Sequence, residues 1–169
     1  RHACEDVYAQ HTHTATSNPG SYCAQFAEVE VDSATGLTRV TDFLVVADIG
    51  RALNPVLARG QYHGGVQMGI GYALCEEVRI DDRGRPVPGG FKNYHLLNAP
   101  DMPEVKVLFI EHDGDDGPYS AKSVGEIATV PTAAAVVNAM RHALGVTFTD
   151  LPVTPERVVA ALAAEGGEV

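Results

Sequence analysis

Hydrophobic and polar positions alternate early in the chain and predict a hairpin of two strands. From residue 25 onward the period of two is that of a half-buried strand. One face carries Ala27, Val29 and Val31, and we place Gln25, Glu28 and Glu30 on the other. The turn-forming sequence at 32–36 separates this run from a second apolar run at 37–46. We therefore expect the two strands to pair as a hairpin.

The next apolar stretch, residues 55–77, predicts a long helix that follows the breaker Asn54-Pro55. It contains five glycines, at positions 60, 64, 65, 69 and 71. Each glycine inside a helix costs about 1 kcal/mol relative to alanine. Such a load indicates close approach of another backbone or of a ligand, and the spacing by itself favours tight helix–sheet packing.

Later segments add further strands and helices. Residues 78–85 resemble a strand and a hairpin turn, 86–103 an extended loop, and 104–111 a strand with alternating apolar positions. Residues 131–144 predict a helix with Pro131 in its first turn and Gly145 at its end, and a last helix follows from Pro155. The fold class expected is α+β, with hairpins of a mixed sheet and helices packed on them.

Composition and charge narrow the classes of function. The 169 residues are enough for one domain with a core. Twelve basic against 22 acidic residues give a formal charge of −10, which disfavours nucleic acid as a partner. No apolar run reaches about 20 residues, so we expect no membrane span. The three cysteines make a poor disulfide framework and favour a reducing cytoplasm.

The first residues of the chain do not resemble a signal peptide, because no apolar core follows the charged start. Because there is no initiator methionine, we interpret the chain as a fragment, a processed product or a trimmed form. We expect a polar leader over 1–22, one domain over 23–165 and a short tail over 166–169.

Two groups of polar residues invite a metal site but have weak spacing. His2, Cys4, His11 and His13 lack the paired ligands of common zinc sites, and a small histidine-rich metal carrier stays a minor hypothesis. The acidic loop holding Asp113, Asp115 and Asp116 lacks the downstream glutamate of a calcium loop. We assign no metal ligand.

The pair Gly125-Glu126 precedes an apolar helix and offers a candidate general base. An isolated glutamate beside a glycine is usually a surface residue or a helix cap. Here small and apolar neighbours favour desolvation, which raises a carboxyl pKa toward the range useful for a base. Gly125 would let a neighbouring group approach the backbone closely.

Four blocks, in order, resemble the molybdenum-binding subunits of the xanthine dehydrogenase/aldehyde oxidoreductase family. The resemblance covers roughly residues 24 to 145. The blocks are the strand and turn at 26–36, Asp-Ile-Gly-Arg-Ala-Leu-Asn-Pro at 48–55, the glycine-rich helix at 60–77, and Lys-Ser-Val-Gly-Glu at 122–126. The chain is identified as the C-terminal part of such a subunit.

The resemblance implies roles for particular residues. Glu126 corresponds to the general base beside molybdenum, and Gln61 to the glutamine that hydrogen-bonds the pterin. The segment implied to lie along the cofactor is Ala121, Lys122, Ser123, Val124 and Gly125. The glycines at 60–71 would then let the helix start against the pterin. Position 68 is methionine where many relatives have glutamine, so no contact is assigned there.

At the level of the whole protein, the resemblance implies a molybdenum hydroxylase. Such an enzyme inserts water-derived oxygen at an electron-poor carbon of a purine-like heterocycle or an aldehyde. The implied cofactor is molybdopterin with molybdenum, as the cytosine dinucleotide. The implied partners are the upstream remainder of the subunit, an iron–sulfur subunit and a FAD subunit. The alternative is a non-catalytic structural or interaction fragment of the same fold.

Overall fold

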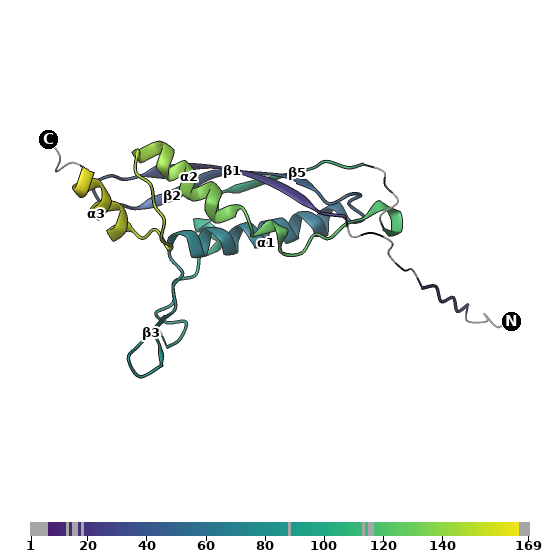
Figure 1. Cartoon of the computed structure of the whole chain (residues 1–169), viewed down its shortest axis with the longest axis horizontal. Coiled ribbons are helices and arrows are strands. Elements are labelled where there is room, and N and C mark those ends of the chain that lie inside the picture. Colours follow the sequence, from purple (N-terminus) through teal and green to yellow (C-terminus); the bar gives the residue numbers. More distant parts are fainter. Residues whose placement is uncertain are drawn as a thin grey trace.

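A computed structural model describes residues 7–165, except 13, 15, 16, 18, 88, 113, 115 and 116. It has two layers, with helices covering one face of a three-stranded sheet (Figure 1). The sheet contains β1 (Tyr22–Val31), β2 (Thr38–Asp48) and β5 (Glu104–Phe109), and the main helices are α1 (Pro55–Leu74) and α2 (Thr132–Leu144). The expected α+β fold is confirmed. Within the described residues, no helix is long and apolar enough to cross a membrane.

The sheet has the order β1-β2-β5 and mixed pairing. Strands β1 and β2 form the predicted antiparallel hairpin, and β5 lies parallel to β2. In the turn, Asp32 Oδ1 accepts the Ala34 N–H at 2.9 Å, and Gly36 has a φ of 76° that suits glycine. The core between sheet and helices is built mainly from Phe43, Val45, Tyr62, Val66, Ile70, Val136 and Met140.

Gln25 lies on the inner face of β1, so our placement of it with the glutamates was wrong. Its position in the chain has the same parity as Ala27 and Val29, and the pleat turns all three toward the helices. Its Nε2 donates to the Ala128 carbonyl at 2.7 Å, and its Oε1 accepts from Thr132 Oγ1 at 2.6 Å. A polar side chain is accepted in this place because both ends of its amide are hydrogen-bonded.

Helix α1 ends at Leu74, three residues before the predicted end at 77. The last turn closes on the Gly71 carbonyl, which accepts the N–H groups of Cys75 at 2.9 Å and Glu76 at 2.8 Å. Beyond it the chain leaves the body as an arm that holds a short hairpin of β3 (Arg79–Ile80) and β4 (Pro86–Val87) (Figure 1). The predicted hairpin turn is therefore confirmed.

Several short elements complete the chain. The segment predicted as an extended loop at 86–103 contains β4 and the single turn η1 (Ala99–Asp101). Helix α2 begins at Thr132, with Pro131 as its N-cap instead of in its first turn, and ends at Gly145 as predicted. The last helix is α3 (Pro155–Glu165), which begins at the predicted proline.

Candidate functional site

Four of the predicted cofactor-contacting residues line one hollow of about 280 Å³. They are Gln61 from α1 and Ala121, Lys122 and Val124 from the loop that precedes α2. The wall between them comes from residues 49–54, which connect β2 to α1. Segments about 60 residues apart in sequence therefore meet where the resemblance placed a cofactor.

A larger hollow, of about 540 Å³, lies at the other end of α1. It is lined by apolar residues such as Ile70, Leu74 and Val153. None of the predicted site residues lines it. Because size alone carries no chemistry, the smaller hollow is the candidate site.

The loop at 120–122 lies alongside the residues that follow β2. Arg51 N–H donates to the Ser120 carbonyl at 3.0 Å, and Lys122 N–H donates to the Ile49 carbonyl at 2.8 Å. Between these bonds, Gly50 and Ala121 form an isolated antiparallel bridge. Gly50 has a φ of 64°, and a Cβ there would collide with the Ser120 carbonyl oxygen. The close approach of the two segments thus requires glycine at position 50.

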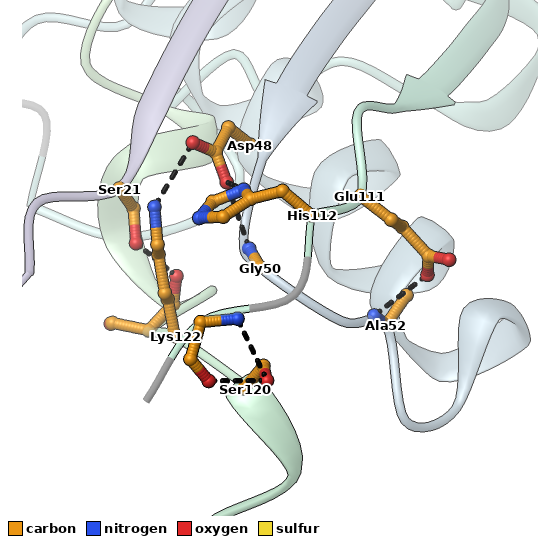
Figure 2. Close-up of polar contacts among 10 residues, drawn as sticks. Ser21, Asp48, Gly50, Ala52, Glu111, His112, Ser120 and Lys122 are labelled. Carbon is orange, nitrogen blue, oxygen red and sulfur yellow. Dashed lines mark hydrogen bonds and ion pairs between the residues drawn. The ribbon is translucent and has the colours of Figure 1, made fainter. Parts of the chain in front are cut away.

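An ion pair between Asp48 and Lys122 joins the same two segments (Figure 2). Lys122 Nζ lies 3.0 Å from Asp48 Oδ2, and the two side chains are only 6% and 19% exposed. Asp48 Oδ1 accepts the Gly50 N–H at 2.9 Å, and His112 Nδ1 lies 3.5 Å from the same oxygen. The Lys122 ammonium also lies 5.8 Å from the centre of the Tyr22 ring. The positive charge of Lys122 is therefore engaged with Asp48.

The surroundings of Asp48 favour its ionised form. Burial by itself would raise the pKa of Asp48, but the Gly50 N–H and the Lys122 ammonium outweigh it and hold the pKa below its usual value. A lowered carboxyl pKa stabilises the fold above the unfolded-state pKa of about 3.9. This stabilisation is lost as pH falls through the lower, folded-state pKa.

Backbone donors gather next to this ion pair. Among the residues that the structure describes, nothing accepts the N–H groups of Ser123, Val124 and Gly125, or bonds to the Gln61 amide. Ser21 Oγ donates to the Ser123 carbonyl at 2.7 Å and ties this segment to the start of β1 (Figure 2). Consecutive free N–H groups are the donors that a polar or anionic group requires. The site thus fits a cofactor rich in oxygen and nitrogen acceptors.

Backbone strain lies just before these donors. Tyr119 and Ser120 have φ values of 57° and 61°, in the left-handed region that glycine favours. Each such residue costs about 1–3 kcal/mol and persists only where the surroundings hold it. Ser120 is held because its Oγ accepts from the Gly114 N–H at 3.1 Å and donates to the Gly114 carbonyl at 2.6 Å.

Glu126 begins the short turn η3 (Glu126–Ala128) and is exposed. The desolvation expected from its small and apolar neighbours is absent within the described residues, because Gly125 and Glu126 are both exposed there. Small neighbours leave a side chain uncovered unless another segment packs over them. The assignment of Glu126 as general base stays a prediction.

No cluster of three or more histidine, cysteine or acidic residues suited to a metal occurs within the described part of the chain. His11 is described and exposed, whereas His2, Cys4 and His13 lie outside the described residues. The same holds for the acidic residues at 113, 115 and 116, and for the predicted tail at 166–169.

Asp48 is the functional candidate that sequence reasoning missed. The block at 48–55 resembles the family as a whole, and that resemblance implies no role for its first residue. An isolated aspartate at a strand end is usually a turn or cap residue. Its pairing with Lys122, 74 positions later, depends on the fold. The one available signal was that both residues lie in blocks that resemble the same family.

Comparison with known proteins shows the family of the chain. Residues 3–103 match the molybdopterin cofactor-binding domain family, and the chain belongs to that family. It is 40% identical over 144 residues to the xanthine dehydrogenase molybdenum-binding subunit of Escherichia coli O157:H7, covering 85% of this chain and 19% of that protein. It is 38% identical over 141 residues to the aldehyde oxidoreductase molybdenum-binding subunit PaoC of Escherichia coli K12, with 82% and 19% covered. The resemblance found in the sequence is confirmed.

Solved structures give the same result. Quinoline 2-oxidoreductase from Pseudomonas putida 86 aligns with a TM-score of 0.74 and 36% identity, over 80% of this chain and 18% of that one. Aldehyde oxidoreductase from Desulfovibrio gigas aligns with a TM-score of 0.77 and 34% identity, over 85% and 15%. The chain spans about a fifth of the length of the curated relatives it matches.

Proposed function

We propose that this chain forms part of the cofactor site of a molybdenum hydroxylase, with Glu126 as its general base. The observation that carries the proposal is the hollow that brings Gln61 together with Ala121, Lys122 and Val124. Beside it lie backbone donors that nothing among the described residues uses. A pterin edge offers the acceptors and donors that such groups need.

The chemistry of each residue determines the role that we propose for it. The Gln61 amide, which has both a donor and an acceptor, would bind the pterin, and the N–H groups of residues 123–125 would bind its oxygen atoms. Glu126 would take a proton from the water-derived nucleophile as it attacks an electron-poor carbon. When bound, the cofactor would supply the metal centre that accepts electrons from the substrate.

The substrate class and the partners are inferred from relatives. Their names include a xanthine dehydrogenase subunit and an aldehyde oxidoreductase, which supports a purine-like heterocycle or an aldehyde as substrate. We further propose the cytosine dinucleotide form of molybdopterin, with iron–sulfur clusters and FAD on partner subunits. We also propose that the cofactor-binding domain begins at residue 23.

The outer face of the sheet supports the presence of further segments in the working protein. Tyr22, Phe26 and Leu108 are 68%, 58% and 57% exposed, and the described helices cover the opposite face. Exposed apolar groups that gather on one face mark an interaction surface. We infer that the remainder of the molybdenum subunit packs on this face, because the chain spans only about a fifth of its relatives.

The test is the variant Glu126→Gln in the complete molybdenum subunit. The amide keeps the shape of the side chain but takes no proton, so turnover should fall by about 10²-fold or more while molybdenum and pterin stay bound. The matched control is Glu165→Gln, an exposed glutamate at the end of α3, which should leave turnover unchanged. Normal turnover of Glu126→Gln would refute the base assignment. A subunit that never holds molybdenum would favour the non-catalytic alternative.

A further inference from the structure

We propose that Asp48 and Lys122 form a clamp that fixes the loop at 118–125 to the end of β2, and so positions the backbone donors of the cofactor site. The proposal rests on the proposed function and deepens it. It assigns Lys122 and Asp48 as positioning residues, which act through the loop and not through a charge presented to the cofactor.

The first step is the direction of the Lys122 side chain. Its ammonium lies 3.0 Å from Asp48 Oδ2 (Figure 2). It also lies above the Tyr22 ring, and the side chain is 6% exposed. A lysine whose charge is buried against a carboxylate is held in one place, because leaving its partner would strand an unpaired charge. The positive charge of Lys122 is therefore paired with Asp48 inside the protein.

The second step is that the loop has no regular secondary structure beyond single turns. Between β5 and α2 the described residues form only the single turns η2 (Pro118–Ser120) and η3. Two consecutive residues of η2 are strained, as described above. A strained loop without a regular ladder needs fixed points on both sides.

The third step is that the clamp and the backbone bonds act on the same few residues. Asp48 binds Lys122 through Oδ2 and the Gly50 N–H through Oδ1. Gly50 in turn bridges to Ala121. The Asp48 carboxylate thus binds both the residues that follow β2 and the loop at 118–125. The free N–H groups at residues 123–125 come directly after this contact.

A second lysine–aspartate pair provides a matched control. Asp42 and Lys106 join the same strand, β2, to β5, and their side chains are 36% and 50% exposed. The residue types and the strand are the same, but this pair lies on the outer face of the sheet and binds no residue of the loop at 118–125. Changing it therefore removes a lysine–aspartate ion pair that does not hold the loop.

The first measurement is amide hydrogen exchange in the cofactor-free form of the complete protein. Asp48→Asn and Lys122→Met should each speed exchange of the Lys122 and Arg51 amides by about tenfold or more, because both amides bond across the clamp. Asp42→Asn and Lys106→Met should not. The Val66 amide in the core of α1 should stay protected in all variants, which separates local loosening from unfolding. Unchanged exchange in Asp48→Asn would overturn the clamp.

The second measurement is the molybdenum and pterin content of the complete subunit after gel filtration. Asp48→Asn and Lys122→Met should both lose most of the cofactor, and Lys122→Arg should retain it because the charge pair is kept. If Asp48→Asn keeps the cofactor while Lys122→Met loses it, Lys122 binds the cofactor directly and the proposal is wrong. A wild-type subunit without molybdenum would refute the proposed function alone, because the exchange measurement decides the clamp without cofactor.

Discussion

Helix α1 carries two pairs of glycines with the same spacing of four residues and opposite surroundings. A Cβ added at Gly65 or Gly69 would collide with Ala128 or Thr132, respectively. A Cβ added at Gly60 or Gly64 would meet nothing within 4 Å. The first pair is explained by the close packing of α1 on η3 and α2, and the second pair has no such explanation within the described residues.

The difference shows that one sequence signal had two causes. The expectation of tight packing is confirmed for Gly65 and Gly69, although the partner is a helix and a turn instead of the sheet. Gly60 and Gly64 form the open pair, because nothing among the described residues packs on them. Each of these two glycines costs about 1 kcal/mol of helix stability without a packing gain. This cost is explained if another group approaches the open face, and Gln61 and the candidate site lie on the same turn as Gly60 and Gly64.

The largest effect on stability is expected for the packed glycines, Gly65 and Gly69. Gly69→Val would place a branched side chain against the buried Thr132 side chain, and we expect a loss of about 3 kcal/mol in the free energy of unfolding. Chemical denaturation of the purified protein measures it. Gly64→Val is the control and should cost far less. Equal losses for the two variants would remove the distinction between the faces.

A smaller effect tests whether the packed side depends on a hydrogen bond as well as on volume. Thr132 is fully buried, and its Oγ1 donates to Gln25 Oε1 at 2.6 Å. Thr132→Val keeps the shape but leaves that acceptor unpaired, so we expect a loss of about 2 kcal/mol. Thr41→Val, at an exposed position of β2, is the control. Denaturation curves that coincide with wild type would show that shape alone holds this contact.

The elements of the fold were largely predictable because local patterns set them. The alternation at 25–31 and 104–111 and the proline before α2 gave strands and a helix close to those observed. The partners of β5 were not predictable, since they depend on pairing between segments about 60 residues apart. Gln25 was misplaced because its polarity was given more weight than its position in the alternation.

The candidate site was predictable only as separate pieces. The resemblance named Gln61 and residues 121–126, but nothing local to either segment shows that they share a hollow with residues 49–54. The exposure of Glu126 was missed for the same reason, because burial depends on which segments pack over a turn. The pairing of Asp48 is the clearest case that sequence alone does not predict. Its partner, Lys122, comes into contact only because the loop at 118–125 lies against the residues that follow β2.

The smallest effect on stability, with the largest consequence for the site, is expected from the open pair. Gly64→Leu adds a side chain where nothing lies within 4 Å, so the free energy of unfolding should change by no more than about 1 kcal/mol, and leucine's helix propensity favours a gain. If the open face lies against a pterin, the same side chain should block it, and the molybdenum content of the complete subunit should fall.

Gly64→Ala is the matched control for that experiment, because it brings the same gain in helix propensity with only a methyl group. It should retain more cofactor than Gly64→Leu at equal or higher stability. Full molybdenum content in Gly64→Leu would show that the open face is not in contact with the cofactor. The second glycine pair would then have to be explained by another segment packing on α1, and the two faces of the helix would differ only in which part of the protein covers them.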